Sequence, residues 1–460
     1  MTETSHEHAK TLTDDVVEIP PTKTPRQRGW GQRSFEWAFG SLPLFYLFGW
    51  WLDKGRDMPI LGLGMLNNLT LFSLFFVLLF YGLIAKDQKL FHPKTTLWPF
   101  SMVALVVLFT LFLSPIHESG FKLFGLYVAI IIGAWATLGI KMGKQCNPDE
   151  SKKWAHYTSW CFVITSVLSL ISITTFPYEI IDADHRRSMF LYVHGFSNTR
   201  AMGDLAIVAM GAAFGLALIY TKPAMKIFLF LLTAGISVAL FWSGTRAGMI
   251  VIPVLVLISV WWIWTQKRHN LWKTLGALVL SVATGAAITL TLLPIPVHSS
   301  FGLRIDRFER TISDVEVVVQ RIQGDEKLST TDNLYRGRSG LWRYAIENIQ
   351  ERPLTGHGMF PLGGDPDRPD SMPYYHYHNI VLELLVSFGV VLGTILLAIF
   401  LAGLWAVTKL AKRSPHHLPV ALGAWAIFLV GMNSGIYITP IYMVFLAFWS
   451  AYAWMQNKTT

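Results

Sequence analysis

Cysteine and charged residues are both scarce in this sequence. It has two cysteines in 460 residues, Cys146 in a polar connection and Cys161 inside an apolar run, which excludes a disulfide framework. Only 15% of the residues are charged, against about a quarter in an ordinary soluble protein. Apolar residues make up 52% and are grouped in runs, several of them longer than the ~18 residues that mark a bilayer span. The sequence therefore predicts a polytopic membrane protein.

An apolar segment is also missing from the first 30 residues, which are polar and contain proline and threonine. A cleavable signal peptide needs an apolar stretch of roughly 7–15 residues, so we predict none here. Residues 1–35 are expected to form a disordered cytoplasmic tail, and the first apolar run is expected to act as an uncleaved signal anchor.

The apolar runs predict an all-α fold of about 12 transmembrane helices. Residues 36–293 would form a bundle of spans 1–9, residues 294–378 a large and partly helical outer loop, and residues 379–460 spans 10–12. The tenth span is expected to begin as an interfacial helix before it crosses the membrane. The predicted spans are 36–52, 65–85, 98–114, 121–140, 155–175, 201–220, 227–243, 247–265, 274–293, 379–405, 418–433 and 436–455.

Lysine and arginine set the orientation of these spans. The connections on the side of the N-terminus hold 21 of them, and those on the opposite side hold 7 outside the long loop 294–378, counting Lys122 at the edge of the fourth span. Because basic connections stay in the cytoplasm, both termini are predicted to be cytoplasmic. The long loop holds 10 basic and 12 acidic residues. The net charge of +9 therefore reports membrane topology, and no nucleic-acid partner is predicted.

Two arginines are predicted at the outer ends of spans. Arg246 lies in the short connection between the seventh and eighth spans, where it could contact lipid headgroups or bind a phosphate through two parallel hydrogen bonds. Arg200 begins the sixth span, and Asp204 follows on the same helix face, either as an ordinary ion pair or to orient the arginine. The spans carry few charges, with Asp204 and Glu383 the clear exceptions, which argues against a coupled transporter.

The long loop contains two predicted helices. Residues 307–323 have one apolar stripe, which is typical of a helix lying on the membrane surface or on the bundle. A second helix is expected to start after Arg338 and to end at Pro353, with an apolar face formed by Leu341, Ala345, Ile346 and Ile349. Arg338 could bind an anion there or belong to a solvated basic cluster. The glycine-rich segment after Pro353 favours a mobile lid or a sharp bend equally.

Two histidines, His376 and His378, lie among aromatic residues where the loop returns to the membrane. Histidine is the side chain best suited to accept a proton near neutral pH. Two histidines two residues apart lack a third ligand at useful spacing, so no metal site is predicted.

These features together resemble the O-antigen ligase and O-antigen polymerase superfamily. The resemblance covers roughly residues 200–400 and rests on short motifs in a fixed order within the topology. They are Arg338 to Trp342, a proline–glycine motif approximated by Glu347 to Gly358, the His378–Asn379 pair, and Gly389 and Gly393 beyond it. The asparagine before the Pro-Leu pair falls at Asn348, and the resemblance gives it no role.

The resemblance implies a glycosyltransferase of the bacterial inner membrane that uses neither a metal nor another cofactor. Such enzymes move a glycan from undecaprenyl diphosphate to a hydroxyl group at the periplasmic face; in the ligases the acceptor is the lipid A-core oligosaccharide. The family's arginines would correspond to Arg200 and Arg246, and its histidine to His378. Arg338, His376 and Asp204 would help to bind substrate.

Other functions stay open at this point. Within the superfamily they are a repeat-unit polymerase and a protein O-oligosaccharyltransferase. A flippase or exporter of lipid-linked glycan is the non-enzymatic alternative, but it would need a basic cavity inside the bundle, which these spans do not supply.

Overall fold

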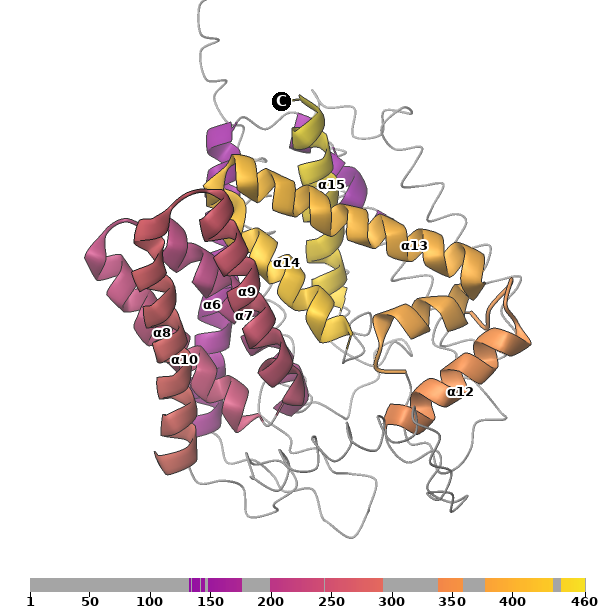
Figure 1. The fold of residues 1–460 in the computed structure, drawn as a ribbon, viewed down its shortest axis with the longest axis horizontal. Coiled ribbons are helices and arrows are strands. Elements are labelled where there is room, and N and C mark those ends of the chain that lie inside the picture. The colour runs from indigo at the N-terminus through magenta and orange to yellow at the C-terminus, as the bar shows by residue number, and fades with distance from the viewer. Residues whose placement is uncertain are drawn as a thin grey trace, which may run out of the picture.

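The computed structural model describes residues 132–133, 135–140, 142–144, 148–175, 199–243, 245–292, 338–358, 377–432 and 440–459. Within these ranges the regular structure is helical and contains no strand (Figure 1). The helices are α6 (Pro148–Thr175), α7 (Thr199–Ile219), α8 (Pro223–Trp242), α9 (Arg246–Thr265), η3 (His269–Leu271), α10 (Trp272–Leu292), α12 (Arg338–Glu351), α13 (Ile380–Arg413), η6 (Pro415–His417), α14 (Leu418–Gly431) and α15 (Pro440–Thr459).

The helices follow the predicted spans from residue 155 onward, although α6 begins earlier and α13 continues further, to Arg413. Four of the helical segments are long and apolar enough to cross a membrane: Met202–Ile219, Pro223–Trp242, His269–Thr289 and Ile380–Arg413. Two shorter apolar helices lie at Ile250–Thr265 and Pro415–Gly431. The described part of the chain is thus that of a helical membrane protein. The first three predicted spans, the 1–35 tail and the predicted helix 307–323 lie outside the described residues, so the count of twelve spans stays a prediction.

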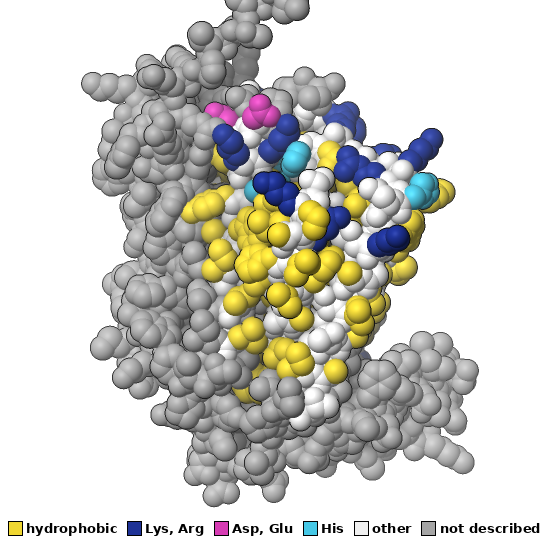
Figure 2. Space-filling model, turned by 90° about the vertical axis from the view of Figure 1, so that its left-hand side faces the viewer, with side chains coloured by type: hydrophobic (Ala, Val, Ile, Leu, Met, Phe, Trp, Pro, Cys, Tyr) yellow, Lys and Arg dark blue, Asp and Glu magenta, His cyan; other side chains and the backbone are white. Residues whose placement is uncertain are grey.

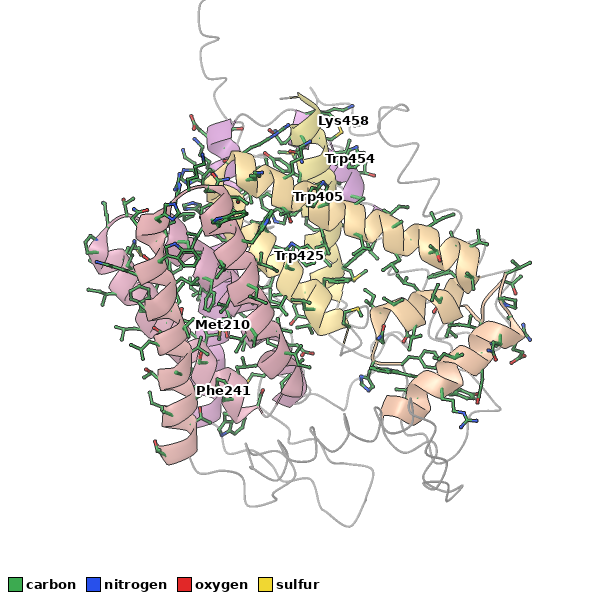
Figure 3. All side chains as sticks on the ribbon, viewed as in Figure 1. Met210, Phe241, Trp405, Trp425, Trp454 and Lys458 are labelled. Carbon is green, nitrogen blue, oxygen red and sulfur yellow. The ribbon has the colours of Figure 1, made fainter. Side chains whose placement is uncertain are left out.

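Helix α7 forms the centre of the bundle, and 94% of its segment Met202–Ile219 is buried. It packs against α6, α8, α9 and α14. Gly211 and Gly215 allow the closest approach, because a Cβ on either would collide with the backbone of α14 at Leu422 or Pro419. Met210 is fully buried on this helix, and Figure 3 shows its place in the middle of the bundle.

The outer helices expose apolar side chains, as helices facing lipid do. Helices α8, α9 and α10 together present an apolar band to the surface, seen in yellow in Figure 2. The most exposed large members of this band are Ile227, Phe228, Leu231, Ile250, Leu257, Trp264 and Leu280. A charged surface would be expected if this face met water, so the apolar band agrees with a membrane-embedded bundle.

One end of the bundle, here called the basic end, collects the predicted cytoplasmic connections. Hydrogen bonds join Lys226 to Thr274, Gln266 to the Lys412 carbonyl and Gln456 to the Gly143 carbonyl. Figure 2 shows lysine, arginine and histidine side chains gathered along this end, above the apolar band. In Figure 3, Trp454 and Lys458 lie here and Phe241 lies at the opposite end, here called the far end. The predicted alternation of the connections is therefore present in the described part of the bundle.

Helix α13 is broken at Gly389, where the backbone leaves helical geometry with φ 73° and ψ 173°. Ile380 to Phe388 form a short first segment, which packs against α12, and the longer second segment runs to the basic end (Figure 1). We predicted that the tenth span would start as a separate interfacial helix; the division into two segments is present, and the interfacial position of the first segment stays a prediction. Its position at Gly389 was not predicted.

Candidate functional site

Two of the predicted arginines lie at helix beginnings that touch each other at the far end. Arg200 follows the first residue of α7, and Arg246 is the first residue of α9. A Cβ on Gly203 would collide with Thr245 and Ser243, so the first turn of α7 lies directly against the connection that precedes Arg246. The backbone thus brings the positions of Arg200 and Arg246 close to each other. The side chains of both arginines lie outside the described part.

Two hydroxyl groups, those of Ser243 and Thr245, lie at this contact. Asp204, on α7, is only 8% exposed. Thr245 precedes α9 in an extended conformation, and its side chain makes no capping hydrogen bond within the described part; its hydroxyl lies 2.8 Å from that of Ser243. The first amide groups of a helix favour an anion. The start of α9 therefore offers a place for a negatively charged group beside Arg246.

The second candidate centre is the turn that leads into α13, at His378. This histidine is 5% exposed and has φ 54°, in the left-handed region that costs a non-glycine residue roughly 1–2 kcal/mol. Asn379 then caps α13, since its side-chain oxygen accepts from Val381 N at 3.0 Å and Leu382 N at 3.3 Å. The chain therefore enters the helix in a fixed orientation immediately after the histidine. His376 lies outside the described residues.

Tyr377 holds this turn against α12. Its ring is fully buried, and its hydroxyl accepts a hydrogen bond from Asn348 Nδ2 at 2.6 Å. Its carbonyl oxygen accepts from Trp342 Nε1 at 3.2 Å, and its amide donates to Glu383 Oε2 at 2.8 Å. Both peptide groups that flank the Tyr377 Cα, and its ring, are thus tied to neighbouring helices.

Helix α12 begins at Arg338 itself, whereas the start was predicted just after this residue, and it ends at Glu351, two residues before Pro353. Leu341 and Ala345 are fully buried and form a small core with Tyr377 and Val386. The prediction was wrong for Ile346, which is 50% exposed. It follows Ala345 by 100° around the helix and so points away from the side that faces α13. The Arg338 side chain lies outside the described part.

The glycine-rich segment forms a sharp bend that is bonded to α13, at least over 353–358. His357 N donates to Val386 O at 2.8 Å and Gly358 N donates to Ser387 O at 2.8 Å. Val390 N donates to Pro353 O at 2.6 Å. The bend interpretation is therefore confirmed for these residues, whereas the second glycine pair, 363–364, lies outside the described part.

Asn348 and Tyr377 are the two site residues that sequence analysis did not assign. Asn348 is 6% exposed; besides bonding Tyr377, its carbonyl oxygen lies 2.9 Å from His357 Nε2. A signal was present, because a polar side chain on the face shared with Leu341 and Ala345 has to find a buried partner. The partner itself, 29 residues further along the chain, could not be found from spacing.

The described residues contain no group of three or more His, Cys, Asp or Glu side chains that could hold a metal ion. The two candidate centres are instead an arginine pair beside a helix beginning and a buried histidine in a constrained turn. In Figure 1, α7 and α9 begin at the far end, and α13 begins beside α12, also away from the basic end. Arginines beside helix amides can bind an anion, and a histidine can accept a proton; a transferase that acts on a phosphorylated membrane substrate needs both kinds of group.

The comparison with protein families agrees with this interpretation. Residues 227–398 match the family model described as O-antigen ligase. The matched segment runs from α8 into α13 and includes Arg246, the α12–α13 bend and His378, while Arg200 precedes it. The resemblance predicted from the sequence is confirmed, and the match supports a function of the O-antigen ligase and polymerase kind on lipid-linked glycans. The search among curated proteins finds no match.

Proposed function

We propose that the protein is an O-antigen ligase-type glycosyltransferase of the bacterial inner membrane, with the far end in the periplasm. It moves a glycan from undecaprenyl diphosphate to a hydroxyl of the lipid A-core oligosaccharide. The observation that carries this proposal is the position of the family match, which contains both Arg246 at the start of α9 and His378 in its constrained turn.

The chemistry follows from the two centres. The acceptor oxygen attacks the anomeric carbon of the glycan, the bond from that carbon to the diphosphate oxygen breaks, and the hydroxyl proton passes to His378. The departing undecaprenyl diphosphate takes the electron pair, and Arg246 and Arg200 neutralise its charge without a metal ion. Arg338, His376 and Asp204 contribute to substrate binding. Because both substrates are anchored in the same membrane, confinement there raises their effective concentration.

The proton-transfer role of His378 is tested with purified protein, lipid-linked donor and core acceptor. His378→Ala should lower the transfer rate by ~10²–10⁴-fold, the usual loss when a general base is removed. Activity of the parent should rise with pH through the histidine range, because a base must be neutral to act. His269→Ala, at an exposed position of the basic end, is the matched control and should keep the parental rate. A His378→Ala enzyme within a few-fold of the parent would refute the role.

The acceptor is tested in a strain that lacks the protein. Loss of long-chain lipopolysaccharide, with full-length lipid-linked polymer retained, supports the ligase reaction. Lipopolysaccharide capped with a single repeat indicates a polymerase, and glycan missing from proteins indicates a protein oligosaccharyltransferase. If the missing protein is a flippase, the strain should instead accumulate lipid-linked glycan on the cytoplasmic side of the membrane.

The orientation is tested with single cysteines in a background without the two native ones. A cysteine at position 330 should react with a membrane-impermeant maleimide in cells with an opened outer membrane. A cysteine replacing Lys267, which is exposed at the basic end, should react only after the inner membrane is permeabilised. The reverse pattern would place the far end in the cytoplasm and would refute the proposed mechanism.

A further inference from the structure

The turn at His378 depends on the peptide group that precedes Tyr377. The amide of this peptide belongs to Tyr377 and donates to Glu383 Oε2 at 2.8 Å. The next peptide, which joins Tyr377 to His378, has its carbonyl oxygen bound by Trp342 Nε1 at 3.2 Å. Two consecutive peptide planes are therefore fixed by side chains from two different helices. Fixing both planes fixes the backbone angles of Tyr377 and the direction in which the chain enters His378.

His378 needs this external support because its own backbone angle is unfavourable. With φ 54° it is one of two non-glycine residues with positive φ in the described part of the chain. Such conformations persist only where the surroundings hold them, and they occur often at functional sites. On the C-terminal side the support is the Asn379 cap of α13. On the N-terminal side it comes from the bonds to Tyr377.

Among the residues that hold the turn at His378, Glu383 is the one whose burial is hardest to explain by packing. It is 3% exposed, although it is a carboxylate on a helix that enters the membrane. It lies in the first turn of α13, where the helix dipole and free amides favour negative charge. Its side chain reaches back past Asn379 to a backbone amide before the helix, much as an acidic residue does in a capping box. A shorter or apolar side chain here could not hold the Tyr377 amide.

We propose that Glu383 is the positioning residue of the site: by accepting the Tyr377 amide it holds His378 where it can take the proton of the acceptor hydroxyl. This inference rests on the proposed function. Glu383 acts through the backbone and not on the substrate, so what the site requires at position 383 is a hydrogen-bond acceptor of the right length. A negative charge and the ability to take up a proton are not required.

The decisive comparison is Glu383→Gln against Glu383→Ala. The glutamine amide oxygen can still accept from the Tyr377 amide but cannot act as a base, whereas alanine removes the acceptor. Glu383→Gln should keep the rate within about five-fold of the parent. Glu383→Ala should lower kcat by ~10²-fold with a smaller change in KM, since a displacement of about 1 Å can cost this much.

The control is Glu347→Ala, another carboxylate of the same region. Glu347 lies on the exposed side of α12, where it pairs with Arg343 at 3.1 Å, and its removal should leave the rate unchanged. Trp342→Phe is a second, milder variant, because it removes only the donor to the Tyr377 carbonyl. It should lower kcat in the same direction as Glu383→Ala, and it keeps the proposal testable if the alanine variant fails to fold.

A measurement independent of transfer activity separates this inference from the proposed function. Diethyl pyrocarbonate modifies accessible histidines, and mass spectrometry reports the extent at His378 in the full chain. Modification should be slow in the parent and in Glu383→Gln, since His378 is 5% exposed, and several-fold faster in Glu383→Ala.

The outcomes are distinguishable. If the parent transfers no glycan, the proposed function fails, while the modification rates still decide the positioning role. A Glu383→Gln enzyme as impaired as Glu383→Ala would overturn the proposal, because it would show that the charge or proton of Glu383 is needed. Equal modification of His378 in all variants would overturn it too.

Discussion

Replacing Gly389 by alanine should disrupt the junction between the outer loop and the tenth span. Gly389 has φ 73° and ψ 173°, in a backbone region that essentially only glycine adopts. A Cβ there would collide with the Leu354 carbonyl and lie 2.8 Å from Pro353 O. The neighbouring Gly356 also has positive φ, and it faces Gly389 so closely that neither position has room for a side chain. The two glycines form a backbone-to-backbone contact that alanine cannot reproduce.

The size of the effect follows from two contributions. The unfavourable backbone conformation costs of the order of 1–3 kcal/mol. Moving the bend away to relieve the collision weakens the hydrogen bond from Val390 N to Pro353 O, worth about 1 kcal/mol. We therefore expect Gly389→Ala to reduce the free energy of unfolding by about 2–4 kcal/mol. Glycosyl transfer should fall as well, because the same bend carries α12 and the bonds to Tyr377.

Gly276 on α10 provides the matched control for the same substitution. It is helical, and a Cβ there meets no atom within 4 Å in the described structure. Alanine in a helix interior is favoured over glycine by about 1 kcal/mol, so Gly276→Ala should be neutral or stabilising. Thermal unfolding in detergent, followed by intrinsic tryptophan fluorescence, measures both variants. If Gly389→Ala has the same unfolding temperature as Gly276→Ala and keeps full activity, the non-helical backbone at Gly389 and its close contact with Pro353 and Leu354 are refuted.

Three further predictions concern other parts of the molecule. Arg246→Ala and Arg246→Lys should both fail to restore capped lipopolysaccharide in a deletion strain at normal expression, because a point charge does not replace a bidentate guanidinium; Arg268→Lys, at the basic end, should restore it. Burial lowers the pKa of His417, in the connection between α13 and α14, to about 4 from 6.5. The folded state therefore favours neutral His417, so the free energy of unfolding should be highest above pH 6.5 and should fall by about 3 kcal/mol as the pH is lowered to 4. In His417→Gln, unfolding measured as a function of pH should show a smaller decline. Leu354 is 70% exposed beside Gly389, where α13 also exposes Val390 and Val391, so we expect lipid there: a bimane label on Leu354→Cys should be quenched by brominated lipid tails, and one on Glu351→Cys much less.

The sequence was sufficient for the helices of the bundle because each is a long apolar run bounded by polar residues. It also predicted that α12 would end near Pro353, since proline cannot continue a helix. The break in α13 was harder to place. Gly389 and Gly393 are both tolerated by a helix pattern, and only the close approach of Leu354 shows that the first of them leaves helical geometry.

The residues of the candidate site also fall into those that the sequence could predict and those that it could not. Arg246 and His378 could be selected because a charged or titratable residue at the end of an apolar run is conspicuous. Tyr377 could not, because tyrosine is common at membrane interfaces and its importance lies in bonds to residues distant in sequence. Glu383 was noticed as a charge within a span, but its partner, the Tyr377 amide, carries no sequence signal.

The enclosure of α7 has a consequence for the order in which the chain assembles. Its glycine face is covered by α14, which begins about 200 residues later in the chain. During synthesis, Gly211 and Gly215 must therefore face lipid or other helices until α14, in about the last tenth of the chain, has been inserted. The bundle closes only near the end of translation, so chains released before residue 418 should expose a small-residue surface that invites association with other helices. We expect such truncated products to be degraded by the proteases of the membrane.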